Sequence, residues 1–502
     1  MISPDLPTFL DRAQHGNLIP VVREVLADQD TPVSAYEKLR TALRSQDPQA
    51  CTFLLESVEG GENIARYSML GGMPRGILKA KDRRAEYHAD GKVTVFDNVD
   101  PLAVLEDLMS AYHPVPDASL PRFTGGAVGF LGYDAVAQFD KVPLSPNPGM
   151  DFPDMVFLIA DTVILFDQVR HTMKLVANAF VEDDAEAAYA DALSRLDQLA
   201  EMLQTSLPRR MLDAQVPAQD LPFTSNTQRE DFEAAVEKSR EYIRAGDIIQ
   251  VVVSQRFAVE GQDDPLQVYR ALRSVNPSPY MFCLELGDVA LAGSSPEVHV
   301  RNEDQQIDIR PIAGTRIRGK DEAEDLYLEQ DLLADPKERA EHVMLVDLAR
   351  NDIGRVCECG SVEVNEFMII ERYSHVMHIV SNVRGKLQPE KNSYDLMRAT
   401  FPAGTLSGAP KIRAMEIIAE LEPDRRGPYG GAVGYFGFDG NLDCCITIRT
   451  CFFAGNKTYV QAGAGLVADS VPATEFEETV NKAKGMIKAL SLARGHQNGE
   501  QA

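Results

Sequence analysis

The chain contains 502 residues, 44% of them hydrophobic, and carries a formal net charge of −26 at pH 7. This length exceeds the usual size of one hydrophobic core, so we expect a globular protein with two large cores. The acidic balance argues against nucleic acid or an anionic membrane as the main partner, because its field repels phosphate. No apolar run reaches the roughly 18 residues of a membrane span, and the first residues lack the pattern of a signal peptide, which predicts a cytoplasmic protein.

The first portion of the chain contains short runs that are rich in apolar residues and bounded by turn residues. Four of them predict antiparallel strands, at residues 51–57, 64–70, 76–80 and 93–96. Periodic apolar residues predict helices at 101–109 and 181–203. The runs 155–166 and 173–177 flank a polar turn and predict a hairpin with a well-buried strand.

A break in composition divides the chain near its middle. Residues 206–223 contain three prolines and no sustained apolar period, which predicts a linker. The next segment, 225–247, has helical periodicity and ends at a glycine, and 248–253 predicts a strand. We therefore expect an α+β protein with one portion at 1–222 and a second at 223–495.

One internal echo is visible: GGAVGF at 125–130 resembles GGAVGY at 430–435. A duplication of related strands would produce it. Glycine-rich strands also recur where another backbone approaches closely. Both explanations remain open at this point.

Two pairs of glutamates are candidates for holding a cation. Glu338 and Glu341 lie three residues apart in a helical pattern, and Glu475 and Glu478 do the same near the C-terminus. Residues three apart share a helix face, so two such faces meeting across a cleft would offer four carboxylates to Mg²⁺. Solvated helix faces are the common alternative.

The small-residue segment AGAGL at 462–466 is a candidate site for an anion. Small residues let a carboxylate approach backbone N–H groups, and a tight strand turn is the alternative. Arg449 ends an apolar strand and would pair with a carboxylate, or form a surface ion pair.

His378 lies on a predicted strand opposite Met377 and Ile379, where it is either a general acid or a structural residue. Thr405 either caps a helix or contacts substrate.

Seven motifs that contain or adjoin these residues resemble those of a known enzyme family. The chain resembles chorismate-utilising enzymes, and among them component I of anthranilate synthases, through PSPYM, SSPE, IRPIAGTR, EHVMLVDLARND, GTLSGAPK, YGGAVGY and QAGAGLVADS, in this order. The likeness covers residues 225–490, and LLES at 54–57 extends it into the first portion. It implies large, mostly antiparallel sheets packed against helices, with residues 223–495 as the catalytic domain.

The resemblance assigns roles to individual residues. Glu341 and Glu478 match direct Mg²⁺ ligands, while Glu338 and Glu475 match residues that hold metal-bound water. His378 matches the residue proposed to assist departure of the ring hydroxyl, and the other implied catalytic residues are Thr405, Glu297 and Gln250. The implied chorismate contacts are Gly314, Thr315, Tyr429, Arg449, Gly463, Ala464 and Gly465. The implied tryptophan site comprises Leu55, Glu56, Ser57, Pro279, Tyr280 and Met281.

Two positions separate the members of this family. Aminodeoxychorismate synthases resemble this chain but carry a lysine where Ala313 lies, and isochorismate-forming enzymes carry one where Gln250 lies. An amide takes up no proton near neutral pH, so ammonia is the implied nucleophile and anthranilate with pyruvate the implied products. Aminodeoxyisochorismate synthase and a non-catalytic amino-acid sensor remain alternatives. Because no amidotransferase nucleophile motif is present, the resemblance implies a separate glutaminase subunit (component II) in a heterotetramer.

Overall fold

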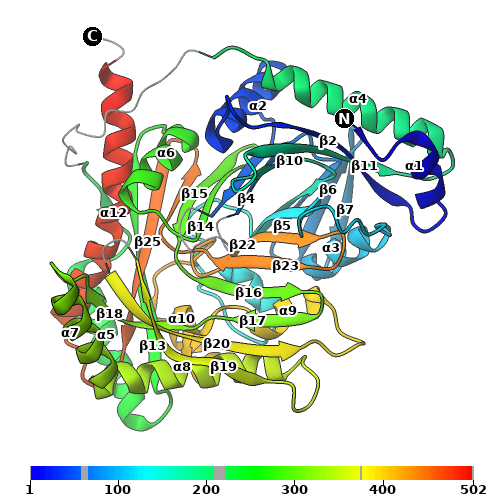
Figure 1. The fold of residues 1–502 in the computed structure, drawn as a ribbon. Helices are drawn as coiled ribbons and strands as arrows, with labels where there is room; N and C mark the ends of the chain where they lie inside the picture. Colours follow the sequence, from blue (N-terminus) through cyan, green and yellow to red (C-terminus); the bar gives the residue numbers. More distant parts are fainter. Residues whose placement is uncertain (1, 58–65, 208–220, 374–375, 500–502) are drawn as a thin grey trace.

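The computed structural model describes residues 2–57, 66–207, 221–373 and 376–499, and its side chains are described as far as residue 495. Two large sheets, in which each strand pair is antiparallel, form the centre of the molecule (Figure 1). Sequence alternation puts one face of each strand inside this sandwich and the other under helices. The expected α+β class with large antiparallel sheets is confirmed.

The first sheet has 13 strands. Its order is β1 (Ile2–Ser3), β2 (Leu18–Leu26), β11 (Thr172–Phe180), β10 (Thr162–Asp167), β4 (Tyr67–Gly72), β3 (Thr52–Glu56), β14 (Tyr280–Glu285), β15 (Val289–Ser295), β24 (Thr450–Ala454), β25 (Lys457–Leu466), β13 (Gln250–Glu260) and β12 (Thr224–Ser225), with β21 (Gly408–Ala409) also paired to β13.

The second sheet has 12 strands. Its order is β18 (Ile312–Ile317), β20 (Val376–Lys386), β17 (Gln306–Ile309), β16 (Val298–Glu303), β23 (Leu442–Ile446), β22 (Ala432–Gly437), β8 (Gly126–Leu131), β9 (Met155–Ala160), β5 (Gly76–Lys81), β6 (Arg84–Ala89) and β7 (Lys92–Asp97), with β19 (Glu363–Arg372) also paired to β20.

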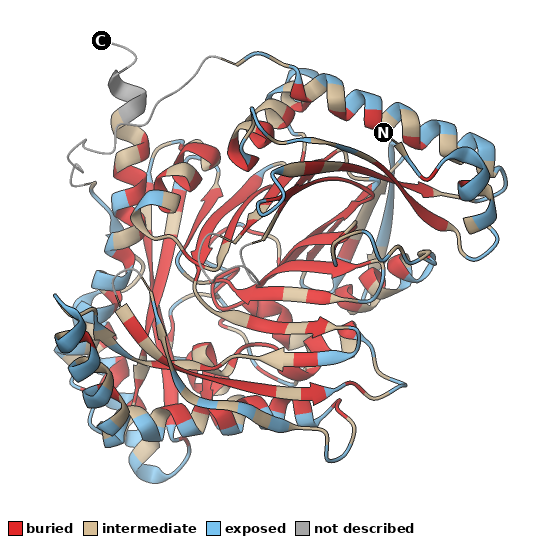
Figure 2. Ribbon diagram, in the orientation of Figure 1, coloured by how far each residue is buried: buried red, intermediate tan, exposed pale blue. Residues whose placement is uncertain are grey.

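Helices cover the outer faces of both sheets. One core cluster joins the first sheet to α2 (Pro32–Gln46), α4 (Ala185–Leu203), α6 (Pro265–Val275) and α12 (Pro472–Gly499). Another joins the second sheet, and the β13–β25 end of the first, to α3 (Pro101–Ser110), α5 (Arg229–Ala245), α8 (Pro336–Gly354), α9 (Ser393–Thr400) and α11 (Lys411–Leu421). The remaining helices are α1 (Leu6–Arg12), a 3₁₀ turn at Tyr133–Gln138, α7 (Glu322–Ala334) and α10 (Gly404–Ser407). Buried residues follow the strands and the inward helix faces (Figure 2).

A third core cluster fills the space between the sheets, and it draws on both portions of the chain. Phe53 and Leu165 of the first portion pack there with Phe282 and Phe452 of the second. Both sheets likewise take strands from either side of residue 222. The boundary at 222/223 stays a prediction, and residues 208–220 of the predicted linker lie outside the described residues.

Most predicted elements of the first portion are present, and one is wrong. The run 155–166 is not a single strand, because it divides at Asp161 into β9 in one sheet and β10 in the other. Arg195 of α4 donates to the Asp161 carboxylate at 2.9 Å, and the Asn178 N–H donates to the Asp161 carbonyl at 2.7 Å. These bonds hold a polar residue at the crossing between sheets. β10 does form the expected hairpin with β11.

The echoed glycine segments are neighbours in space, since β8 and β22 pair with Gly129 opposite Gly434. A Cβ atom on Gly129 would lie 1.9 Å from the carbonyl oxygen of Val156, and one on Gly434 would lie 2.1 Å from that of Asp443. Close backbone approach therefore accounts for glycine at both positions.

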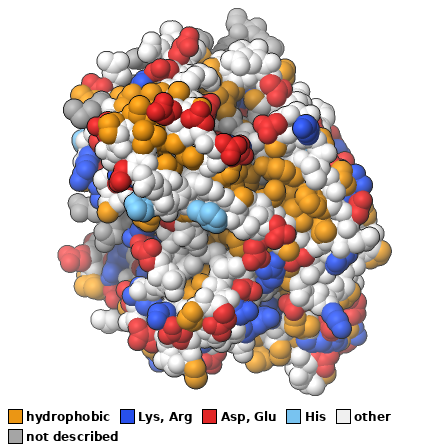
Figure 3. Space-filling view, turned by 90° about the vertical axis from the view of Figure 1, so that its right-hand side faces the viewer, with side chains coloured by type: hydrophobic (Ala, Val, Ile, Leu, Met, Phe, Trp, Pro, Cys, Tyr) orange, Lys and Arg blue, Asp and Glu red, His pale blue; other side chains and the backbone are white. Residues whose placement is uncertain are grey.

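The surface agrees with the acidic composition. On the face shown in Figure 3, the Lys and Arg side chains of the described residues are interspersed with Asp and Glu instead of forming a continuous basic surface. None of the helices in the described ranges is long and apolar enough to cross a membrane. All seven cysteines are free thiols, six of them buried.

Candidate active site

A cavity of about 790 Å³ opens where α8, α10 and α12 meet strands of both sheets. It brings together residues that lie far apart in the sequence, including nearly every expected catalytic, substrate and metal residue. These are Gln250, Glu297, Gly314, Thr315, Glu338, Glu341, His378, Thr405, Tyr429, Arg449, Gly463, Gly465, Glu475 and Glu478. Ala464 is the exception, because it is fully buried on the other face of β25, in the core cluster with α5 and α11.

Two helices present the four glutamates. The helix α8 begins at its N-cap Asp335, whose carboxylate accepts the N–H of Lys337 at 2.9 Å, and this places Glu338 and Glu341 in its first turns. Burial raises the pKa of Glu341, and the negative charges of Glu338 and Glu478 raise it further. Burial also raises the pKa of Glu475, to which Glu478 contributes.

The carboxylates suit a hard cation in kind, because Mg²⁺ prefers oxygen ligands and their mutual repulsion is what a cation relieves. In the described parts of the chain, however, no three Asp, Glu, His or Cys side chains stand close enough to form a ready metal site. Glu478 is instead paired with Lys482, whose Nζ lies 2.7 Å from its Oε1. Residues of α8 and α12 would have to draw together to hold the ion.

Lys482 is a functional candidate that the sequence reasoning missed. Its Nζ also donates to the carbonyl oxygen of Gly463 at 3.0 Å, so it joins the second glutamate pair to the glycine-rich strand. The signal was available, since Lys482 follows Glu478 by four residues in a helical pattern and must share its face.

His378 stands on β20 with its ring in the cavity wall, while Met377 and Ile379 point into a small apolar cluster, as predicted. Its Nδ1 lies 3.0 Å from the carbonyl oxygen of Gly314 and 3.1 Å from Thr315 Oγ1. A carbonyl only accepts, so Nδ1 carries the hydrogen, and Nε2 of the neutral ring is left as an acceptor. Burial lowers the pKa of His378, which favours this neutral form.

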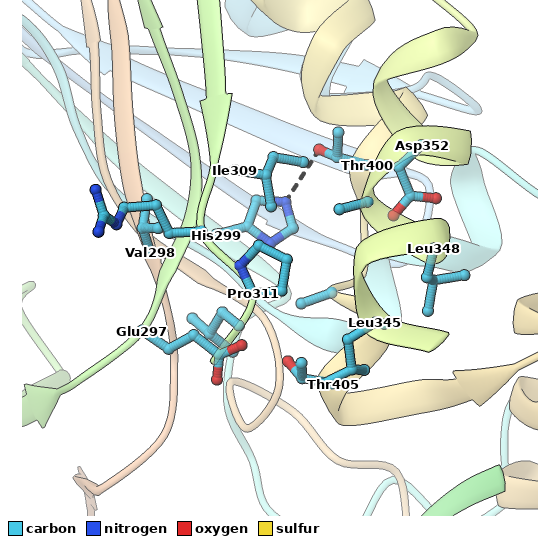
Figure 4. Close-up of a pocket in the computed structure, with 15 residues that line it drawn as sticks. Glu297, Val298, His299, Ile309, Pro311, Leu345, Leu348, Asp352, Thr400 and Thr405 are labelled. Atoms are coloured by element: carbon cyan, nitrogen blue, oxygen red, sulfur yellow. Dashed lines mark hydrogen bonds between the residues drawn. The ribbon is translucent and has the colours of Figure 1, made fainter. Parts of the chain in front are cut away.

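Glu297 follows β15 and faces Thr405 of α10 (Figure 4). Burial raises its pKa to about 7, against the opposing effects of the Thr405 hydroxyl and the Arg449 charge. The Thr405 hydroxyl is buried and lies within α10, whose N-cap is Ala403, so Thr405 does not cap the helix. A carboxyl group that titrates near neutral pH can give or take a proton.

The glycine-rich strand β25 pairs with β13, with Gly465 opposite Val252. A Cβ atom on Gly463 would lie 2.9 Å from the Tyr429 hydroxyl, and one on Gly465 would lie 2.6 Å from Nε2 of Gln250. Side chains of the cavity wall thus pack directly on this backbone, and a larger residue at either position would have to displace them. The Nε2 of Gln250 also reaches Glu341 Oε1 at 3.5 Å.

A buried ion pair supports this wall from behind. The Arg426 guanidinium donates to the Glu422 carboxylate at 2.6 Å and lies over the ring of Tyr429, 5.7 Å from its centroid. Glu422 also accepts the N–H of Ser254 on β13 at 2.8 Å. Both charges are fully desolvated, so each depends on the other.

The residues implied for tryptophan are divided between two faces. The motifs LLES and PSPYM do meet, because β3 and β14 pair with Glu56 opposite Met281 and Leu55 opposite Phe282. Leu55 and Tyr280 face the interior between the sheets. There the Tyr280 hydroxyl donates to Asp443 and accepts from Arg301, both at 2.8 Å.

Glu56 and Met281 instead point toward α6. The Glu56 carboxylate is occupied there by the hydroxyl of Tyr269 and by the guanidinium of Arg273 at 3.2 Å. Pro279 lines the large cavity itself. The tryptophan site at this junction stays a prediction.

Comparison with known proteins places this cavity in a family. Residues 51–488 match the chorismate binding enzyme family. Component 1 of anthranilate synthase from Pseudomonas aeruginosa is 49% identical over 97% of this chain and 98% of its own length, and that from Acetivibrio thermocellus is 45% identical over 98% and 99%.

Solved structures agree with this assignment. Component I of anthranilate synthase from Streptococcus pneumoniae superposes with a TM-score of 0.76 at 36% identity, covering 92% of this chain and 99% of that one. The menaquinone-specific isochorismate synthase of Escherichia coli, at 17% identity and a TM-score of 0.68, shares the fold over 96% of this chain and 98% of its own. The chain belongs to the family of chorismate-binding enzymes and is a chorismate-utilising lyase. Within that family, component 1 subunits of anthranilate synthases match it over nearly its full length.

Proposed function

We propose that this chain converts chorismate and ammonia to anthranilate and pyruvate, the reaction of an anthranilate synthase large subunit. The observation that carries the proposal is the chemistry of two positions in the cavity wall. Ala313 and Gln250 both line the cavity, and neither can act as a nucleophile or base as a lysine would. No lysine is present at either position to activate water or to attack the ring, which supports an external amine as the nucleophile.

Residues on opposite walls of the cavity bind the two carboxylates of the substrate. Arg449, which lines the cavity, pairs with one carboxylate of chorismate, and Gly463 and Gly465 line the same cavity. Glu341 and Glu478, with Glu338 and Glu475 beside them, would hold Mg²⁺ once α8 and α12 draw together. The ion would supply positive charge to neutralise a carboxylate of the substrate.

Glu297 gives the proton that lets the ring hydroxyl leave. With a pKa of about 7, it is half protonated at neutral pH, whereas burial keeps His378 neutral with Nε2 as an acceptor. The C–N bond to ammonia forms as the C–O bond of the hydroxyl breaks, the hydroxyl departs as water, and the added nitrogen gives up a proton. Loss of a ring C–H proton then breaks the C–O bond to the enolpyruvyl group, which leaves as pyruvate and takes up a proton, so the ring becomes aromatic. His378 Nε2 accepts a hydrogen bond from the substrate and orients it.

Ammonia comes from a separate glutamine amidotransferase subunit, component II, in a heterotetramer. Free ammonium salt at alkaline pH replaces that subunit in a test, because it supplies the same nucleophile. Tryptophan, the end product of the reaction sequence, inhibits the enzyme from a site at the junction of β3 and β14. Here the support is the pairing of the two motifs in the sheet.

The direct test is the gain of anthranilate fluorescence when chorismate, an ammonium salt and MgCl₂ are added to the purified chain. We expect a gain that depends on all three, with one pyruvate released for each anthranilate. Chromatography separates the alternatives, because aminodeoxyisochorismate or aminodeoxychorismate would accumulate without pyruvate. A folded protein that binds an amino acid but leaves chorismate unchanged would be a sensor and would contradict the proposal.

A further inference from the structure

A second, much smaller pocket of about 30 Å³ lies behind Glu297 and Thr405 (Figure 4). Both residues, together with Leu345, line this pocket and the large cavity alike, so the two spaces share a wall. A single water molecule needs roughly 10–15 Å³ measured in this way, so the pocket has room for one or two. It is too small for any part of a ring.

His299 of β16 supplies the second observation. It is 3% exposed, and its Nε2 lies 3.2 Å from the hydroxyl of Thr400. That hydroxyl also lies 3.0 Å from the carbonyl oxygen of Leu396, to which it must donate, so it accepts from His299 Nε2–H. The ring therefore carries its hydrogen on Nε2 and has a lone pair on Nδ1. Among the described residues, no protein group is bonded to Nδ1. The buried hydroxyl of Thr405 faces the Glu297 carboxyl group at the edge of the same pocket.

The pocket thus presents an imidazole lone pair, a hydroxyl and one side of a carboxyl group to the same small space. Buried polar atoms in folded proteins are nearly always hydrogen-bonded, by ordered water where no protein group serves. We propose that this pocket binds a water molecule that bridges His299 Nδ1 and the Glu297 carboxyl group, and that His299 is a positioning residue for Glu297. This inference rests on the proposed role of Glu297 as proton donor.

The bridging water has a defined effect on Glu297. It contacts the carboxyl group from the small pocket and stabilises the charged form against burial. The other charges around the pocket are Arg449 on the cavity side, Arg310 at the rim, and the Asp352–Lys411 ion pair, with an Oδ2 to Nζ distance of 2.7 Å. His299 itself contributes no charge, because burial lowers its pKa to about 3.

The test replaces His299 by leucine, which has similar volume but no acceptor for the water. Loss of the water leaves Glu297 less solvated, so its pKa rises and its protonated form persists to higher pH. We expect the alkaline fall of kcat, measured at constant free ammonia, to move up by about half to one pH unit, with KM for chorismate nearly unchanged. His299→Asn keeps an acceptor near the Nδ1 position and should restore most of the wild-type profile. Ala349→Val, which fills the pocket without touching a polar group, should shift the profile as His299→Leu does.

His342 provides a matched control. It is fully buried, its Nε2 bonds to Ser381 Oγ at 2.6 Å, and its Nδ1 also has no partner in the described part of the structure, but it lines neither pocket. His342→Leu should therefore leave the pH midpoint in place, whatever it costs in thermal stability. An equal shift in both leucine variants, or a shift in neither, would overturn the proposal.

A crystal structure that resolves ordered water gives a second, independent readout. We expect density within hydrogen-bonding distance of His299 Nδ1 and Glu297, and its absence would overturn the water site. The proposed proton donor is tested separately, because Glu297→Gln with full activity would remove that role without bearing on the pocket.

Discussion

Individual side chains in this cavity are held in states that suit chemistry more than stability. Glu341 shows this most clearly, because burial and two like charges raise its pKa in the folded state. As pH rises, the Glu341 carboxyl group loses its proton at a lower pH in the unfolded chain than in the folded protein. Ionisation of Glu341 at neutral pH therefore lowers the free energy of unfolding. That stability returns as pH falls from the raised folded value toward the unfolded value of 4.5.

This repulsion predicts how Mg²⁺ acts on the protein. In the wild type, MgCl₂ should raise the melting temperature at pH 7, since a ligand present at 100 times its Kd adds roughly 2.7 kcal/mol. Glu341→Gln should melt at a higher temperature than wild type without Mg²⁺, gain less from adding it, and lose activity by at least about 100-fold. Thermal melts and rates across a Mg²⁺ titration check both parts. A full Mg²⁺-dependent gain in the variant would remove Glu341 from the metal site.

The sequence predicted the chemistry of single residues well where those residues belong to long motifs or follow helical spacing. Glu338 and Glu475 lie in one cavity because each shares a helix face with its partner, as spacing alone indicates. His299 could not be found in this way. Its proposed role depends on the free lone pair of Nδ1, which is defined only because Nε2 is hydrogen-bonded to Thr400. That arrangement is a property of the packed fold.

Secondary-structure elements set the shape of the cavity through close backbone contacts. The β25 strand was expected to offer backbone N–H groups to an anion, and the structure adds a steric reason for its glycines. A methyl group at position 463 would meet the Tyr429 hydroxyl at 2.9 Å and the carbonyl oxygen of Val253 at 3.1 Å.

Gly463→Ala should therefore raise KM for chorismate about tenfold or more and cost roughly 1–3 kcal/mol of stability through overpacking. Gly354→Ala is the control, because a Cβ atom at the end of α8 meets nothing within 4 Å. That variant should keep wild-type kinetics and be unchanged or slightly more stable. Steady-state kinetics and denaturant unfolding measure both. A Gly463→Ala enzyme with unchanged KM would show that the wall yields at this point.

Elements with strong local patterns were predictable, and those defined by tertiary contact were not. The helix α5 ends at Gly246 in the left-handed region, as its sequence indicates. The short segments α10 and β21 have too few residues for any period, and they form because Gly408 pairs with Val251 of β13. The division of 155–166 into two sheets was missed for the same reason, since both halves are equally apolar.

At the scale of the whole molecule, the two portions of the chain share both sheets. The contact of β3 with β14 joins them directly, and β8 with β22 joins them again in the opposite sheet. A ligand bound at the first junction would act on the cavity through the sheet, because Pro279, which directly precedes β14, lines the cavity. Such a ligand shifts activity only by its differential affinity for two arrangements of this shared structure.

Feedback by tryptophan is the prediction that tests this connection. Ser57 directly follows β3 and is partly buried, so Ser57→Leu adds apolar bulk and removes a hydroxyl at the junction without touching the cavity. We expect the variant to keep catalysis largely intact while tryptophan inhibits it about tenfold or more weakly, a change of about 1.4 kcal/mol in binding free energy. Because linkage is reciprocal, chorismate should weaken tryptophan binding to the wild type by the same factor by which tryptophan weakens chorismate binding.

Titration of tryptophan against anthranilate fluorescence measures the first effect, and calorimetry with and without chorismate measures the second. Ser45→Leu, at an exposed serine of α2, is the control and should be inhibited like the wild type. Identical inhibition curves for all three proteins would place the regulatory site away from the junction of β3 and β14.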